Sequence, residues 1–170
     1  MRAAARLLLI ALLLAVAACG WRLRGPGPGA SLEGFVLFVD ASAAEADVRT
    51  SVERGIRTAG AELAAGPAAA DAVLVLLGET VQRRAVSISA DARAQEYELT
   101  YNLRYRLDTS DGESLIAPET VQVTGVYQYD PNNVLGTQAR ADTLTGRLRQ
   151  DAARLLLLRV HAVLTRGVQE

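Results

Sequence analysis

Cys19 is the residue best placed for covalent chemistry, because it is the only cysteine among 170 residues and follows a segment typical of export. The segment from Leu7 to Ala18 is an uninterrupted apolar run behind two arginines, Arg2 and Arg6. The run is too short to cross a bilayer, which takes about 20 residues, but it has the length of a signal-peptide core, roughly 7–15 residues. A lone thiol in an exported chain lacks a disulfide partner, so we expect another chemical use of Cys19.

The order Val16-Ala17-Ala18-Cys19 resembles the lipoprotein box of bacteria. The resemblance implies that residues 1–18 are removed and that Cys19 becomes a lipid-carrying N-terminus. The several acyl chains of such a terminus would make a permanent anchor, since stable attachment takes more than one chain. Gly20 stands where Asp would signal inner-membrane retention, so the chain resembles the class sorted to the outer membrane. The alternative is an ordinary secreted protein in which the cysteine occurs by chance.

Elsewhere the sequence lacks the side-chain combinations that catalysis and metal binding need. The only histidine, His161, lies beside Val160 and Val163 without a nucleophile or an acidic partner at a recognisable spacing. One cysteine and one histidine cannot form a Cys/His metal cluster, and the prolines of residues 25–29 remove the amide donors of a phosphate-binding loop. We therefore expect no enzyme, no metal and no cofactor other than the covalent lipid on Cys19.

The charge balance argues against nucleic acid as a partner. Loss of Arg2 and Arg6 from the 18 basic residues leaves 16 against 19 acidic residues, so the net charge of the mature chain is about −3. Domains that bind nucleic acid are typically basic. Every basic residue is an arginine, which suits bidentate contact with phosphate, although the abundance of Ala, Gly and Leu favours a GC-rich genome as the reason.

Four arginines are candidates for a phosphate-facing patch. Arg83 and Arg84 adjoin an expected irregularity in a strand, Arg93 lies near the next turn, and Arg140 opens the last helical stretch. If one end of the fold brings them together, their guanidinium groups can hold phosphate through paired hydrogen bonds. The competing interpretation is that these arginines are scattered and solvated.

The first elements that would position these residues are a strand and a helix. Phe35–Val39 predicts a short strand buried on both faces. Ser42 and Glu45 have the spacing of a capping box, which predicts a helix to about Ala59, where Gly60 can end it. The apolar stripe of this helix comprises Val48, Val52, Ile56 and Ala59. Gly55, inside the helix, predicts a close approach to the sheet.

A second strand is predicted from about Val73. Apolar side chains occupy odd positions as far as Val81 but even positions at Val86 and Ile88. A strand can change phase only through a bulge or a break, which we expect near residues 82–84. A turn is expected over residues 90–94.

Two further strands are predicted on either side of a hairpin loop over residues 109–113. The first alternates strictly from Glu96 to Asp108, with tyrosines and leucines on one face. The second runs from about Ser114 to Tyr129, and Pro118 within it is expected at an edge or a bulge. The outer face is polar and comprises Thr100, Asn102, Arg104, Arg106, Thr120, Gln122 and Thr124.

A turn over residues 130–133 precedes a long helix, predicted from about Thr137 to Arg166. Its apolar stripe comprises Leu144, Leu148, Ala152, Leu155, Leu156, Val160 and Val163. Leu157 and Leu158 widen the stripe, which indicates either a deeply buried helix or a contact with a partner. The order β-α-β-β-β-α predicts an α+β two-layer sandwich, with two helices packed on one face of a mixed four-stranded sheet. The expected organisation is a signal peptide over 1–18, a lipid-anchored tether over 19–33 and one domain over 34–170.

The mature N-terminus, Cys19-Gly20-Trp21-Arg22-Leu23-Arg24-Gly25, resembles that of the LptE family of lipopolysaccharide-assembly lipoproteins. Later features agree in order: the short strand, the helix, the alternating strand opened by Glu96-Tyr97, and Tyr127-Gln128-Tyr129-Asp130 before the long helix. The resemblance covers essentially the whole mature chain.

Membership of this family implies a lipid anchor in the outer membrane, on its periplasmic face, and a position inside the lumen of the β-barrel LptD as a plug and assembly factor. The polar lumen of a barrel would match the polar face of the predicted sheet. The family also implies contact with lipopolysaccharide through basic residues near a hairpin and near the start of the last helix. Those places hold Ala90 and Thr137 here, with Arg93 and Arg140 nearby.

Three functional hypotheses remain at this point. The first is a plug and assembly subunit of an outer-membrane barrel that delivers lipopolysaccharide. The second is an auxiliary lipoprotein of another cell-envelope lipid-transport system. The third, a lipoprotein enzyme, would require a pocket with perturbed titratable groups.

Overall fold

A computed structural model describes residues 31–88 and 94–167 of the chain. The expected signal peptide, Cys19 and Arg93 lie outside these residues. The elements in order are β1 (Val36–Asp40), α2 (Ala46–Thr58), β2 (Glu62–Leu63), the 3-10 turn η1 (Pro67–Ala69), β3 (Ala72–Ile88), β4 (Ala94–Thr109), β5 (Ser114–Gln128) and α3 (Val134–Gly167). No helix of the described ranges is both long enough and apolar enough to cross a membrane.

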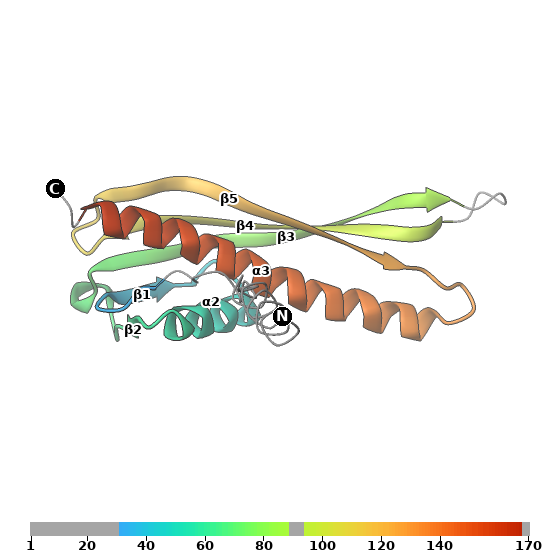
Figure 1. Cartoon of the computed structure of the whole chain (residues 1–170), viewed down its shortest axis with the longest axis horizontal. Helices are drawn as coiled ribbons and strands as arrows, with labels where there is room; N and C mark the ends of the chain where they lie inside the picture. The colour runs from blue at the N-terminus through green and yellow to red at the C-terminus, as the bar shows by residue number, and fades with distance from the viewer. Residues whose placement is uncertain (1–30, 89–93, 168–170) are drawn as a thin grey trace, which may run out of the picture.

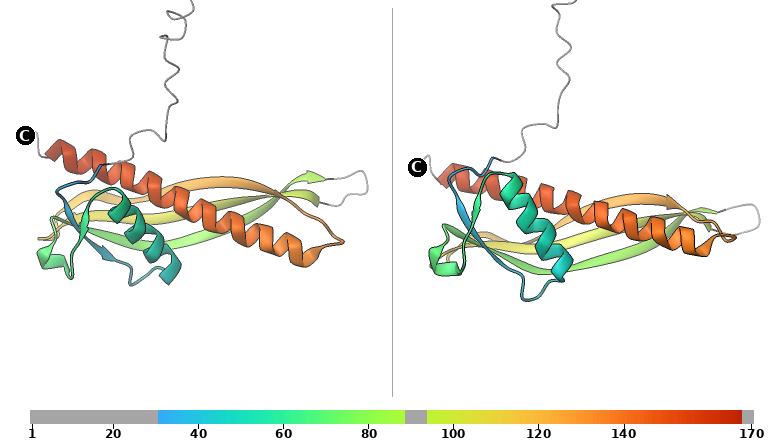
Figure 2. Two further views of the ribbon diagram at one scale, coloured as in Figure 1. Left: turned by 60° about the horizontal axis from the view of Figure 1, so that its bottom comes forward. Right: turned by 90° about the horizontal axis from the view of Figure 1, so that it is seen from below.

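The two helices lie on one side of a mixed sheet, as the α+β expectation requires (Figures 1 and 2). The sheet has five strands in the order β2-β1-β3-β4-β5, so the expectation of four was wrong. The additional strand, β2, consists of two residues that pair in parallel with Val36 and Leu37 of β1. So short a segment leaves no alternation in the sequence, and only its pairing defines it as a strand.

Strands β3, β4 and β5 form a long antiparallel meander, whereas β1 pairs with β3 in parallel. The meander and α3 give the molecule an elongated shape, in which α2, β1 and β2 occupy one half (Figure 1). The strict alternation of β4 is confirmed, because Leu99, Tyr101, Leu103, Tyr105 and Leu107 are all buried on the helix side. The hairpin over 109–113 is also confirmed, with Gly112 at a φ of 89°.

Strand β5 forms one edge of the sheet. Its register shifts where Glu119 pairs with Tyr105 and Ile116 pairs with Leu107, so Pro118 lies in a bulge on an edge strand. Proline is tolerated there because it has no N–H to donate to a neighbouring strand. The expectation for Pro118 is therefore confirmed.

Strand β3 changes phase earlier than the sequence predicted. Leu76 pairs with Tyr105 and Gly78 with Arg104, so the first bulge lies at Leu77, where Gly78 has a φ of 123°. A second irregularity falls between Ala85 and Ser87, and residues 82–84 keep a regular register. Up to Leu76 the even residues Ala72, Leu74 and Leu76 are the fully buried ones. The hydrophobic pattern was ambiguous because both faces of this segment carry apolar side chains.

Helix α2 confirms its apolar stripe but not its predicted start. Val48, Val52 and Ile56 are buried, and Gly60 ends the helix with a φ of 88°. The helix begins at Ala46 after Glu45, which makes no side-chain capping hydrogen bond. Ser42 lies in the preceding turn, where its backbone N–H donates to Asp40 Oδ1 at 3.0 Å, so the capping-box prediction was wrong.

Helix α3 begins at Val134, three residues before the predicted start. The Asn133 side chain supplies the cap, since its Oδ1 accepts a hydrogen bond from the Gly136 N–H at 2.9 Å. Leu148, Ala152, Leu156 and Val160 of the predicted stripe are buried. Leu155 is 37% exposed and does not belong to it, whereas Leu157 is buried and Leu158 is 38% exposed.

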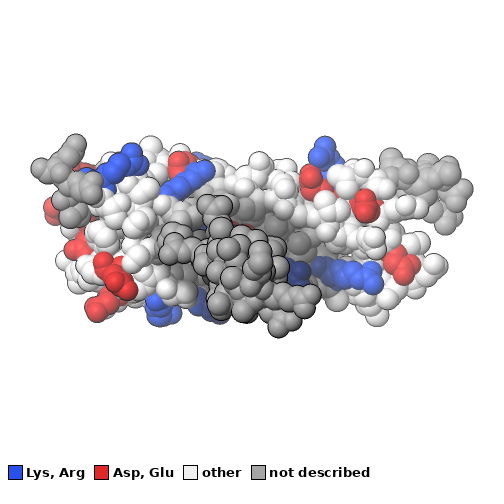
Figure 3. All heavy atoms as spheres, in the orientation of Figure 1, with Lys and Arg blue, Asp and Glu red and all other residues white. Residues whose placement is uncertain are grey.

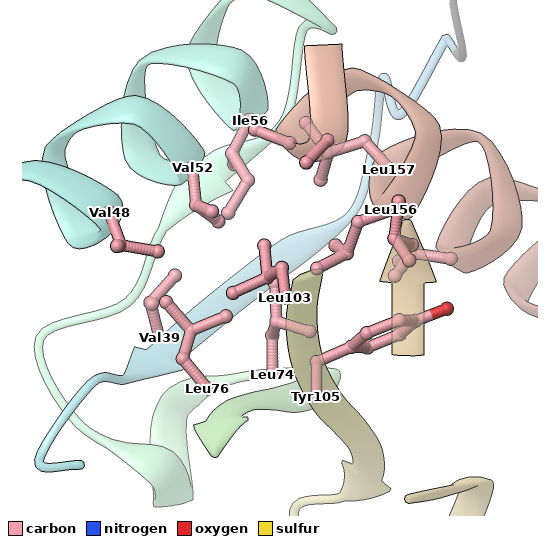
Figure 4. Close-up of a cluster of buried hydrophobic side chains, with 14 of the residues drawn as sticks. Val39, Val48, Val52, Ile56, Leu74, Leu76, Leu103, Tyr105, Leu156 and Leu157 are labelled. Atoms are coloured by element: carbon pink, nitrogen blue, oxygen red, sulfur yellow. The ribbon is translucent and has the colours of Figure 1, made fainter. Parts of the chain in front are cut away.

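The core lies where α2 and α3 meet over the sheet (Figure 4). Val52 and Ile56 of α2 and Leu156 and Leu157 of α3 point toward the inner face of the sheet and toward one another, above Leu103. Gly55 faces α3 rather than the sheet, because a Cβ there would lie 2.7 Å from Leu157 Cδ1. The predicted close approach therefore exists, but it is between the two helices.

The helix crossing gives a stability prediction. Gly55→Ala should be less favourable than Gly146→Ala by about 1–3 kcal/mol in free energy of unfolding, because the added methyl group overpacks the contact with buried Leu157. Gly146→Ala is the matched control: no atom lies within 4 Å of a Cβ at that helical position, so it should gain about 0.5–1 kcal/mol from helix propensity. Chemical denaturation followed by circular dichroism measures both. Equal gains at the two positions would contradict the close crossing.

Candidate functional site

Helix α3 is fastened to the sheet by a cluster of Glu79, Tyr101 and Arg149, here called the Glu79 cluster. The Tyr101 hydroxyl donates to Glu79, and Arg149 Nη2 lies 3.0 Å from Glu79 Oε1. The Glu79 and Arg149 side chains are only 10% and 14% exposed, respectively. Arg149 also reaches Asp47 of α2 at 3.4 Å, so one guanidinium joins both helices to β3.

A second cluster of a tyrosine, a glutamate and an arginine lies one strand further along, with its glutamate on β5. The Tyr105 hydroxyl donates to Glu119 of β5, and Arg159 of α3 donates to Glu119 Oε1 at 2.7 Å. The hydrogen bond from Tyr105, and then Arg159, lower the pKa of Glu119. Burial, more than the neighbouring carboxylate, raises the pKa of Tyr105 and likewise that of Tyr101. The tyrosines are therefore neutral hydrogen-bond donors, and we assign both clusters a structural role.

The first bulge of β3 explains why Glu79 faces the helices. Glu79 pairs with Leu103, a buried residue of the inner face. Without the extra residue at Leu77, position 79 would point to the opposite side of the sheet, because side chains alternate along a strand. The tyrosines of the alternating strand were the one sequence signal of these clusters, and nothing in the sequence indicated their partners.

The structure separates two of the four candidate arginines. Arg83 pairs with Leu99, which is buried under the helices, whereas Arg84 pairs with Glu98, so these neighbours point to opposite faces of β3. Arg84 makes an ion pair with Glu98 at 3.0 Å, and its side chain is 75% exposed. Arg93 lies outside the described residues.

Arg83 lies in a cluster of aromatic side chains near the end of the meander. Its guanidinium carbon is 4.8 Å from the centre of the Tyr97 ring, a distance at which a cation and an aromatic face attract. Tyr97 stacks on Tyr127 at 5.8 Å and meets Tyr129 edge-on at 5.6 Å. The Tyr127 hydroxyl is the principal group that raises the pKa of Arg83, so this cation is held in place by aromatic neighbours.

Arg140 borders a hollow of about 510 Å³ between α3 and the edge strand β5. The lining also includes Arg147 and Tyr127, so Tyr127 contacts both this hollow and the Arg83 cluster. Helix α3 approaches β5 closely here, since a Cβ on Gly125 would lie 2.8 Å from Leu144 Cδ1. Basic side chains gather along the first half of α3 (Figure 3). Sequence reasoning missed Arg147 and the three tyrosines, whose common location depends on strand register.

The middle of the outer face of the sheet is polar. Asn102 of β4 donates to Thr80 of β3 at 3.4 Å and accepts from Gln122 of β5 at 3.1 Å. This row of hydrogen bonds crosses the three long strands on the side away from the helices. Cross-strand polar pairs of this kind stabilise a sheet that meets water or a hydrated partner.

His161 and the acidic side chains of the described ranges do not come together as a metal site. His161 is half-buried on α3, and its Nδ1 has no hydrogen-bond partner among the described residues. Those residues also contain no group of three or more His, Cys, Asp or Glu side chains arranged to hold a metal ion.

The fold is shared with small bacterial lipoproteins. The lipoprotein B of Nitrosomonas europaea has a TM-score of 0.70 at 22% identity, over 88% of this chain and 96% of that one. The rare lipoprotein B of Shewanella oneidensis has a TM-score of 0.66 at 19% identity, over 79% and 99%. A minor lipoprotein of Acinetobacter baumannii has a TM-score of 0.60 at 20% identity, over 75% and 90%. No curated protein sequence matches the chain significantly.

The architecture is thus an α+β domain with two helices on one face of the sheet, the fold of these solved structures. The family model described as LptE, lipopolysaccharide-assembly, matches residues 35–160. The chain therefore belongs to the LptE family, as the resemblance of its N-terminal motif implied.

The Glu79 cluster gives a second prediction. Arg149→Met should lower the free energy of unfolding by about 1.5–3 kcal/mol, because Glu79 loses its charged partner in a site that water scarcely reaches. Arg154→Met is the control on the same helix: Arg154 pairs with Asp151 at 3.2 Å, but both side chains are more than half exposed, so a change within about 0.5 kcal/mol is expected.

Addition of Glu79→Gln to Arg149→Met completes a double-mutant cycle. The second substitution should cost much less in the Arg149→Met background than in the parent, because the ion pair is then already lost and Glu79→Gln removes the uncompensated carboxylate. Additive costs in urea denaturation would mean that Arg149 and Glu79 are not energetically coupled.

Proposed function

We propose that this chain is an outer-membrane lipoprotein that assembles lipopolysaccharide into the outer leaflet together with the β-barrel LptD. In this proposal the lipid on Cys19 anchors the chain to the periplasmic face of the membrane, and the domain acts as a plug and assembly factor without catalysis. Family membership supports the role in lipopolysaccharide assembly. The observation that carries the plug role is the polar outer face formed by β3, β4 and β5.

The outer face suits a hydrated protein enclosure better than a lipid environment. Its central row, Thr80, Asn102 and Gln122, consists of neutral hydrogen-bonding side chains, and the lumen of an outer-membrane barrel is polar. The opposite face of the sheet is covered by α2 and α3 (Figure 2). The outer face can therefore lie against the lumen wall of a barrel without removing apolar side chains from the core.

Partner recovery tests this assignment. A tagged copy isolated from outer membranes in mild detergent should bring down one large, heat-modifiable β-barrel at equal stoichiometry. A photo-crosslinking amino acid at Asn102 or Gln122 should link to that barrel more efficiently than one at the control position Arg57 on α2, because the outer face meets the lumen wall. Recovery of the lipoprotein alone, or with inner-membrane components, would favour an auxiliary role in another envelope lipid-transport system.

Contact with lipopolysaccharide is the second part of the proposal, through Arg83, Arg84, Arg93 and Arg140. Replacement of all four by Ala should weaken binding of purified lipopolysaccharide by at least about tenfold, since each charge-assisted contact with phosphate contributes appreciably. The matched control replaces Arg49, Arg57, Arg106 and Arg166, which removes the same charge elsewhere. Equal binding by the two quadruple variants would exclude a specific role for these four arginines.

A further inference from the structure

A groove of about 360 Å³ runs between α2 and α3, separate from the arginines assigned above. This volume lies toward the lower end of the range for small-molecule sites, roughly 300–1,000 Å³. The lining comprises Ser51, Arg54, Gly55, Thr58, Ala59, Gln150, Ala153, Arg154 and Leu157. Both helices therefore contribute a wall.

The floor of the groove is apolar. Ala153 and Leu157 are 3% and 4% exposed, respectively, and Gly55 contacts Leu157 at the helix crossing. Ile56 and Leu157 lie side by side at this crossing, toward the core (Figure 4). Leu158 follows Arg154 by one helical turn and is 38% exposed, so it extends the apolar surface beside the groove. An apolar chain can lie here without covering buried polar groups.

Each wall of the groove carries one exposed arginine. Arg54 on α2 has no carboxylate within ion-pair distance in the described ranges, because the nearby Glu53 is engaged by Arg49 at 2.7 Å and Arg57 at 3.7 Å. Arg154 on α3 lies 3.2 Å from Asp151, but such an exposed pair is weak. Two guanidinium groups above an apolar floor are complementary to an acyl chain with an anionic head.

The groove also lies beside the point where the chain enters the domain. The Leu32 backbone N–H donates to the Ala59 carbonyl at 2.7 Å, and Ala59 lines the groove. The chain from Cys19 to Leu32 can span at most about 45 Å when fully extended. An anchor on Cys19 would therefore keep the groove within reach of the membrane surface.

We propose that the groove binds an anionic glycerophospholipid of the anchoring membrane, with one acyl chain along the apolar floor and the phosphate between Arg54 and Arg154. The site uses none of the four arginines assigned to lipopolysaccharide, so the phospholipid proposal can be tested independently of the lipopolysaccharide proposal. A lipid held there would orient the domain relative to the leaflet that carries the anchor.

Photolabelling of the purified full chain tests this site. The probe is a lysophosphatidylglycerol with a diazirine in its acyl chain. Its label should appear by mass spectrometry on peptides containing residues 51–59 and 150–157. Arg54→Gln with Arg154→Gln should weaken probe binding by about tenfold or more, as expected for loss of two charge-assisted contacts. The control Arg57→Gln with Arg166→Gln removes the same charge outside the groove and should bind as the parent does.

A further variant and an uncharged probe distinguish the contribution of the apolar floor to binding from that of Arg54 and Arg154. Ser51→Trp should fill the groove and remove labelling by lysophosphatidylglycerol and by the uncharged monoacylglycerol of the same chain length. The paired Arg→Gln variant should retain labelling by the uncharged probe. Circular dichroism of each variant establishes that it remains folded, since residues 51, 54 and 154 are not buried.

Three results would overturn the proposal. One is unchanged binding of the anionic probe after the paired Arg→Gln substitution. Another is a self-association that Ser51→Trp abolishes in analytical ultracentrifugation, which would identify a second copy as the occupant. The third is displacement of the probe by lipopolysaccharide at a far lower concentration than by phosphatidylglycerol. Retained probe binding by the Arg83, Arg84, Arg93 and Arg140 variant would support a site distinct from the lipopolysaccharide patch.

Discussion

The attachment of α3 to the antiparallel meander β3-β4-β5 is the interaction on which the rest of this structure depends. One side of the helix is buried through Leu148, Ala152, Leu156 and Val160. Arg149 of the Glu79 cluster and Arg159, which pairs with Glu119, fasten the helix to the sheet at two points ten residues apart. Burial of the tyrosine rings supplies hydrophobic free energy, while each hydroxyl satisfies a carboxylate that would otherwise be costly near the core. The helix is thereby fixed in register as well as in position.

Because both helices pack on the same side, the two faces of the sheet have different surroundings. The inner face holds α3 and, in one half of the molecule, α2 (Figure 1). The outer face retains a row of neutral polar side chains across β3, β4 and β5. A two-layer domain with one covered and one polar face can pack inside a hydrated enclosure without losing its own core, and this physical property connects the fold with the proposed plug role.

The arginines with aromatic or apolar neighbours occur at separate places in the described part of the domain. The Arg83 cluster and the hollow beside Arg140 share Tyr127 near one end of the meander. The groove with Arg54 and Arg154 lies between the helices, where the chain enters the domain. Arginines on aromatic or apolar surfaces suit amphiphilic ligands with phosphate groups, which fits membership of a lipopolysaccharide-assembly family.

Local patterns in the sequence were sufficient to predict four features: the alternation of β4, the apolar stripe of α2, the hairpin at Gly112 and the bulge at Pro118. Each of these depends on residue periodicity or on the backbone preferences of one residue type. The sequence also predicted a lipid on Cys19, which lies outside the described residues. Tertiary structure alone decided the two-residue strand β2, the facing of Gly55 toward α3, and the opposite directions of Arg83 and Arg84. It also brought Glu79 to Arg149 across 70 residues, because one extra residue at Leu77 reverses the side-chain direction of the strand, and apolar residues on both faces conceal that reversal in the sequence.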